Sequence, residues 1–165
     1  MSIDNIPLHN FLYQNFFEKN LVDLKANTAD NILNQIPDII FFGGNQKKII
    51  IVFNNSQNKF LGDIQMKFLD DILTACGLTI SDVALVNIFH RNITHYQLMM
   101  QLHPKKVLIF GIPSNNLDLP FNIPFFQIQN FQEQVFMLSP SIEELQMNTE
   151  LKKSLWECLQ KIFNI

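Results

Sequence analysis

The chain has 165 residues and a formal net charge of −3, and 47% of its residues are apolar. This size and apolar content fit one folded domain and exclude a disordered or fibrous chain. Arg91 is the one arginine of the sequence, and proteins bind DNA largely through arginine and lysine, so we expect no strong direct nucleic-acid binding.

The sequence also limits location and cofactors. Its first residues lack a basic start and a smooth apolar stretch, so they do not predict a signal peptide. No stretch approaches the roughly 18 uninterrupted apolar residues of a membrane span, and a cytoplasmic location is expected. Cys76 and Cys158 are too few for a four-thiolate iron–sulfur cluster and have apolar neighbours. We therefore predict two buried thiols and no cofactor.

The chain opens with apolar residues at helical spacing. These candidate partner-binding residues are Phe11, Leu12, Phe16 and Phe17. We predict a helical N-terminal segment over residues 1–30, followed by a single α/β domain over residues 31–165. An apolar helical stripe can dock into a partner's groove, or it can pack on the core of its own domain. Both readings stay open at this point.

Strands and helices alternate after this segment. Pro37 is expected to end a short helix, and Gly43 with Gly44 marks a turn. Strands are predicted over 47–53, 82–89, 105–111, 123–129 and 134–138. Helices are predicted over 63–77, with Asp63 capping the start and Gly77 the end, over 93–102, and from Asn148 or Thr149 onward. Just before the last helix, either Ser139 caps with Pro140 at the first helical position, or Ser141 and Glu144 form a capping box.

This order of elements predicts an α/β fold. The unbroken β-branched run "KKIIIVF" at residues 47–53 is typical of a strand buried on both faces, as in a parallel sheet. Alternating strands and helices favour right-handed crossovers that cover both faces of the sheet. We therefore predict three α/β/α layers around a mostly parallel central sheet of four to five strands.

Ligands of such sheets bind at the carboxyl ends of the strands. The loop that begins at Asn54 has no phosphate-binding glycine motif and no acid or base before Asp63. Asn87, at the end of a strand, could read a base edge or tie down a neighbouring loop. His95 and His103 share no close spacing with cysteine or carboxylate, so we expect no metal site.

The middle of the chain resembles the uracil-DNA glycosylases. The resemblance rests on "FLGDIQMKFLDDILTACGLTISDVALVNIFH" at 60–90, "PKKVLIFG" at 104–111 and "LSPS" at 138–141. It implies the glycosylase fold, with a vestigial pocket at Asn54, Asn87, Ser139, Pro140 and Ser141. Ser139 stands where those enzymes carry a histidine, and a serine cannot supply the same donor to a departing uracil anion. The resemblance therefore implies the fold without the catalytic groups.

A second resemblance covers the C-terminal part, which is similar to the psi subunit of bacterial DNA polymerase III. The shared positions are Ser139, Pro140, Leu145, Asn148, Lys152 or Lys153, Leu155, Trp156 and Leu159. Psi proteins have a glycosylase-like fold without the active site and bridge the clamp loader to a chi subunit. The resemblance implies a non-catalytic interaction module with clamp-loader subunits and a chi-like protein as partners. The alternatives are a divergent glycosylase-like enzyme, a base- or nucleotide-binding domain, and an α/β domain of unrelated function.

Overall fold

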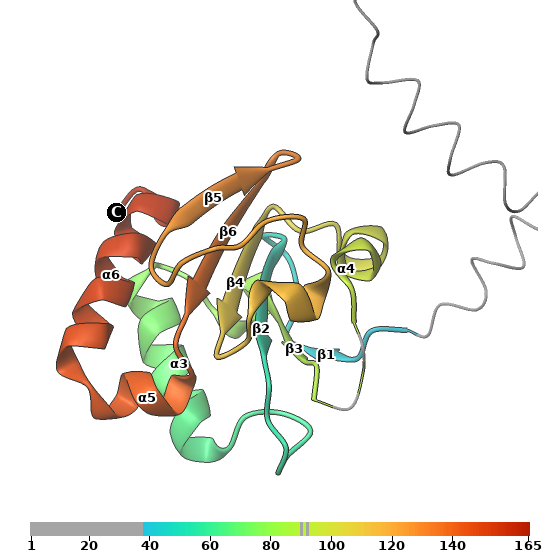
Figure 1. The fold of residues 1–165 in the computed structure, drawn as a ribbon. Coiled ribbons are helices and arrows are strands. Elements are labelled where there is room, and N and C mark those ends of the chain that lie inside the picture. The colour runs from blue at the N-terminus through green and yellow to red at the C-terminus, as the bar shows by residue number, and fades with distance from the viewer. Residues whose placement is uncertain (1–37, 90, 92) are drawn as a thin grey trace, which may run out of the picture. The chain divides into compact units, whose positions relative to one another are not determined.

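A six-stranded sheet organises residues 38–89, 91 and 93–165, which are the residues that this computed structural model describes (Figure 1). The strands are β1 (Phe41–Phe42), β2 (Ile49–Phe53), β3 (Val83–Asn87), β4 (Lys106–Phe110), β5 (Ile128–Phe131) and β6 (Gln134–Ser139). The helices are α3 (Asp63–Ala75), α4 (His95–Leu102), α5 (Ile142–Met147) and α6 (Thr149–Phe163), with short 3₁₀ turns η1 (Ile80–Asp82) and η2 (Ser114–Leu117). Asp38–Ile165 is one compact unit. The predicted boundary at residue 30 lies outside the described residues.

The α/β class is confirmed, but the sheet is mixed and larger than predicted. Its strand order is β1-β3-β2-β4-β6-β5. The four middle strands are parallel, whereas β1 pairs antiparallel with β3 and β5 pairs antiparallel with β6. The prediction of four to five mostly parallel strands was wrong at these edges. The two-residue strand β1 is too short to leave a periodic pattern in the sequence.

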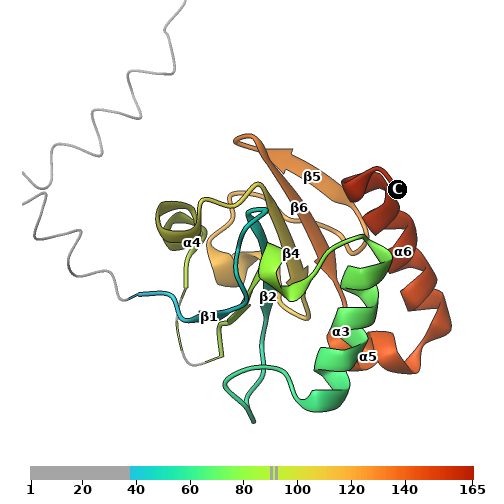
Figure 2. The same ribbon diagram turned by 180° about the vertical axis from the view of Figure 1, so that it is seen from behind.

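The middle strands are mainly apolar, and β2 is wholly so, because helices cover both of their faces. Figures 1 and 2 show α3, α5 and α6 on one face of the sheet and α4 on the other. Each face has its own buried core. Alternate residues of β2 divide between the two: Ile49, Ile51 and Phe53 face α3, while Ile50 and Val52 join the core that contains α4.

The segment 123–129 was predicted as one strand, and this prediction was wrong in its position. Phe125 makes only an isolated bridge to Leu138, and the strand β5 begins later, at Ile128. Two residues with positive φ, Gln132 and Glu133, then form the tight turn into β6. The apolar residues indicated a strand in this part of the chain, but the hairpin turn determines which residues pair with β6.

Local side-chain contacts set most helix starts. Gly62, and not Asp63, is the N-cap of α3, and its N–H donates to the Gln65 side chain at 3.0 Å. The Ser141–Glu144 capping box is present at α5, so Ser139 does not cap and instead ends β6. In α6 the Asn148 side chain accepts from the N–H groups of Glu150 and Leu151. Within the described part of the chain, no helix has the length and apolarity to cross a membrane.

Candidate functional site

The register of the parallel strands places two of the predicted pocket residues, Asn87 and Ser139, at the carboxyl ends of their strands but far apart. Asn87 lies opposite Phe53, Phe53 opposite Phe110, and Phe110 opposite Ser139. Asn87 and Ser139 are thus separated by three strand spacings, or roughly 14 Å. The buried rings of Phe53 and Phe110 belong to the core on the α3 face, between the two polar residues. Asn87 and Ser139 therefore do not converge on a common pocket.

The side chain of Asn87 holds the loop that follows β2. Its Oδ1 accepts from the N–H of Asn55 at 3.0 Å and from the N–H of Phe89 at 3.1 Å. Its Nδ2 donates to the carbonyls of Asn55 and Asn58 at 2.9 Å each and of Lys59 at 3.2 Å. Both ends of the amide are therefore engaged with backbone. Of the two roles considered for Asn87, the structure shows the loop-tying one.

Ser139, Pro140 and Ser141 lie together but have different surroundings. Ser139 is 0% exposed, and its hydroxyl has no hydrogen-bond partner in the structure. Ser141 accepts from the N–H of Glu144 at 3.2 Å and so caps α5. Pro140 borders a mainly apolar cavity of about 450 Å³ together with Phe125. A buried hydroxyl and a capping hydroxyl leave little polar chemistry for a ligand here.

Asn54 lines a separate polar cleft of about 440 Å³. The cleft is formed by Asn54, Ile88, Phe89, Arg91, Thr94, Asn115, Asn116 and Asp118. These residues follow β2, β3 and β4, whose order in the sheet is β3-β2-β4. The crossover helices α3 and α4 leave to opposite faces, so the cleft lies where ligands bind in doubly wound sheets. His90, a neighbour of Arg91 in the sequence, lies outside the described residues.

The titratable groups of the described residues do not form a metal or nucleophile site. No group of three His, Cys, Asp or Glu side chains comes close enough among them to hold a metal ion. His95 is buried, and its Nε2 is 2.9 Å from Oε1 of Gln134, a buried polar pair that the sequence analysis did not find. Cys76 and Cys158 are buried, as predicted, and burial raises the pKa of both thiols. Both therefore stay protonated near neutral pH.

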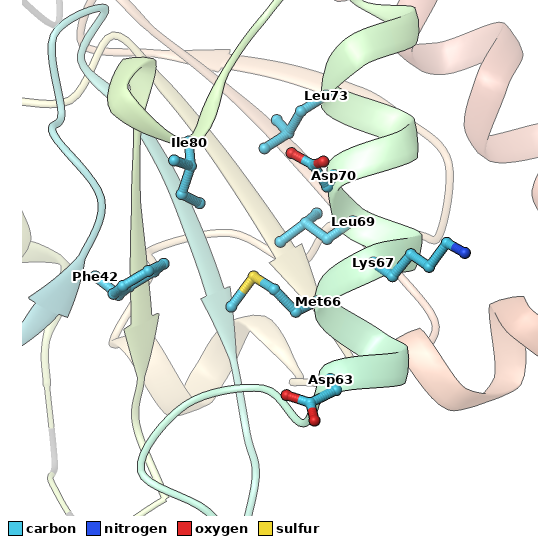
Figure 3. A pocket seen from close by; sticks show the side chains of 8 residues that line it. All are labelled: Phe42, Asp63, Met66, Lys67, Leu69, Asp70, Leu73 and Ile80. Atoms are coloured by element: carbon cyan, nitrogen blue, oxygen red, sulfur yellow. The ribbon is translucent and has the colours of Figure 1, made fainter.

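A third hollow, which the sequence analysis missed, lies between β1 and α3 (Figure 3). This apolar groove has a volume of about 440 Å³ and is lined by Phe42, Asp63, Met66, Lys67, Leu69, Asp70, Leu73 and Ile80. The run "IIFF" at residues 39–42, between Pro37 and Gly43, was its signal in the sequence. Of that run, Phe42 lines the groove.

Comparison with known proteins adds no assignment. No protein-family model matches the chain, and no curated protein matches its sequence. The four candidate partner-binding residues, Phe11, Leu12, Phe16 and Phe17, lie outside the described residues. The function therefore has to be argued from the site geometry and from the resemblances in the sequence.

Proposed function

We propose that the chain is a non-catalytic protein-interaction module, a psi-like accessory subunit of the bacterial replicative clamp loader. It would have the glycosylase-like fold without the catalytic groups. Its partners would be clamp-loader subunits, bound through the N-terminal segment, and a chi-like protein, bound by the α/β domain. A cytoplasmic location goes with this role.

One observation carries the proposal: the positions that glycosylases use for chemistry have other tasks in this chain. The Asn87 amide is bonded to loop backbone on both sides, and Ser139 is wholly buried. Neither group is free to bind a base or to stabilise a departing anion. Loss of one such donor typically slows an enzyme by about 10²–10³. An interaction role needs neither group.

The C-terminal psi-like positions support the same proposal. Leu145, Leu155 and Leu159 are buried in the core on the α3 face, and Trp156 packs against it. Asn148 caps α6 through its side chain. The shared residues thus have structural tasks that a related fold would also need. They support kinship in fold, and the partner assignment follows from the resemblance.

Affinity purification of the tagged chain from its native cell extract, followed by mass spectrometry, tests the proposal. We expect clamp-loader subunits to be recovered with the chain. A full-length variant with serine at positions 11, 12, 16 and 17 should lose them, because the apolar anchors are gone. A well-folded tagged chain that recovers no replication protein would contradict the proposal.

The polar cleft favours a second candidate function, a base- or nucleotide-binding domain. The amides of Asn54, Asn115 and Asn116 offer paired donors and acceptors of the kind that read base edges. One contact argues against this function. Nη1 of Arg91, the cationic side chain of the cleft, already donates to the carbonyl of Asp38 at 2.6 Å and is engaged there instead of with a phosphate. Uracil-excision assays and calorimetric titration with free bases and nucleotides test this candidate. Binding that is lost on Asn54→Ala would favour it over the interaction module.

A further inference from the structure

The apolar groove between β1 and α3 has a buried floor and a partly exposed rim. Leu69 and Leu73 of α3 form the floor, with exposures of 1% and 3%. Met66 and Ile80 are half-buried, and Phe42 is 44% exposed. Figure 3 shows Phe42, Met66 and Ile80 pointing into the space between the strand and the helix. Apolar side chains thus surround an open hollow on the protein surface.

The β1 side of the groove is unusually apolar for a sheet edge. Ile40, Phe41 and Phe42 are consecutive and all exposed, whereas edge strands are commonly protected by charged residues. Phe42 lies opposite Leu85 of β3, on the face that α3 covers, and its ring centroid is 5.6 Å from that of Phe60. An exposed apolar surface of this kind, next to a hollow, is typical of a protein-binding site.

The charges along the groove are acidic. Asp63 and Asp70 are seven residues apart on α3, or about 10 Å along the helix axis. The one salt bridge between described residues joins Lys47 and Asp82, so neither groove carboxylate is paired in this way. Lys67 also borders the groove, but Figure 3 shows its side chain extending away from Phe42 and Ile80. A partner that lies in the groove would meet two free carboxylates.

We propose that this groove binds an amphipathic helix of a partner protein whose apolar stripe is flanked by lysine or arginine. The apolar floor fits side chains at helical spacings i, i+3 or i+4, and i+7. The two carboxylates match basic residues seven apart on such a helix. This inference rests on the proposed role as an interaction module, and it adds a binding surface and the chemistry of the partner.

The test uses the full chain, labelled with ¹⁵N, and a synthetic leucine–lysine peptide of about 14 residues, or four helical turns. The leucines are placed on one helical face. A scrambled peptide of the same composition, without an apolar stripe, is the control. NMR titration should show saturable shifts in the amides of Phe42, Met66 and Ile80 with the first peptide only. Affinity should fall as salt rises, because the carboxylates are at the surface.

Charge-reversal variants locate the site. The double variant Asp63→Lys with Asp70→Lys should weaken peptide binding at least about tenfold, since each reversal replaces an attraction by a repulsion. Asp71→Lys with Asp118→Lys is the matched control, because it changes the net charge by the same amount at residues that line other cavities. The control should bind within about twofold of the unmodified chain, because neither reversed charge lines the groove.

Three results would overturn the inference. The shifts could fall outside the groove, or the double variant could bind as well as the control variant. Alternatively, groove resonances could change with protein concentration in the absence of peptide, which would identify a second copy of the chain as the occupant. The peptide experiment involves no clamp-loader protein. The groove can therefore fail to bind the peptide while the chain still binds the clamp loader. Equally, the groove can bind the peptide while the chain does not bind the clamp loader.

Discussion

The side-chain amide of Asn87 makes five hydrogen bonds at the carboxyl end of the sheet, and all of them go to backbone atoms. Asn87→Ala should lower the free energy of unfolding by about 2 kcal/mol, because several partly buried backbone groups lose their partner. Urea unfolding measures this loss. Asn87→Asp should lose at least as much, because it places a carboxylate oxygen against the three carbonyls to which Nδ2 donates. An unchanged midpoint for Asn87→Ala would show that the loop does not depend on the amide.

Ser139 gives a contrasting prediction. Its hydroxyl is buried and unpaired, so Ser139→Ala should cost nothing or stabilise the fold by up to about 1 kcal/mol. Ser139→His, which introduces the glycosylase residue, should destabilise by about 2 to 3 kcal/mol, because the site has no room for an imidazole. Thermal unfolding of both variants checks the pair. A stable His variant would mean that the position can still accept a catalytic group.

Asp82 predicts a pH dependence. Its carboxylate accepts from the N–H of Thr79 at 2.8 Å and lies 3.4 Å from Nζ of Lys47. The Thr79 N–H and then Lys47 hold the pKa of Asp82 below its usual value. The ionised form therefore stabilises the fold above the ordinary aspartate pKa of about 3.9, and this contribution is lost as pH falls through the lower folded-state pKa.

Asp82→Asn should consequently lower the melting temperature at pH 7, with a gap that closes below about pH 4. Melting curves of both proteins between pH 7 and about pH 2 provide the measurement, because the gap closes only below the ordinary aspartate pKa. The control is Asp118→Asn, an exposed carboxylate for which we expect no such change. A gap that stays constant with pH would assign the effect to packing and not to charge.

At the level of elements, the starts of α5 and α6 were predictable because they depend on residues close in sequence, whereas the cap of α3 was placed one residue late. The Ser141–Glu144 box and the start of α6 could both be expected from spacing alone. The strand β1 could not, because two residues carry no period and their pairing with Leu85 and Val86 depends on a partner some forty residues later. The same holds for Asn87, whose role depends on how the loop at 54–60 folds back.

The short helix α5 offers a test of its cap. Ser141→Ala should lower the free energy of unfolding by about 1 kcal/mol, as is typical for loss of an N-cap hydroxyl. Ser141→Asp should preserve most of the stability that the cap contributes, because a carboxylate also accepts from the N–H of Glu144. Equal losses in the two variants would mean that the hydrogen bond of the cap does not set the cost.

At the scale of the whole molecule, the fold class followed from the alternation of strands and helices, whereas the function did not follow from the fold. The sheet offers a polar cleft on one side of its carboxyl edge and an apolar groove beside β1. The cleft was not visible in the sequence, because its lining comes from several segments. For the groove, the apolar run at residues 39–42 indicated only the side that Phe42 lines. The described residues thus support a domain with binding surfaces, and the psi-like assignment depends on the residues from Ser139 to Leu159.

Titration calorimetry of the purified chain against the purified clamp-loader complex of the same cell directly tests whether the chain binds the clamp loader. We expect saturable binding. The account also predicts that serine at positions 11, 12, 16 and 17 abolishes this binding, whereas Asn54→Ala in the polar cleft leaves it unchanged. Absence of any binding by the folded, unmodified chain would contradict the account.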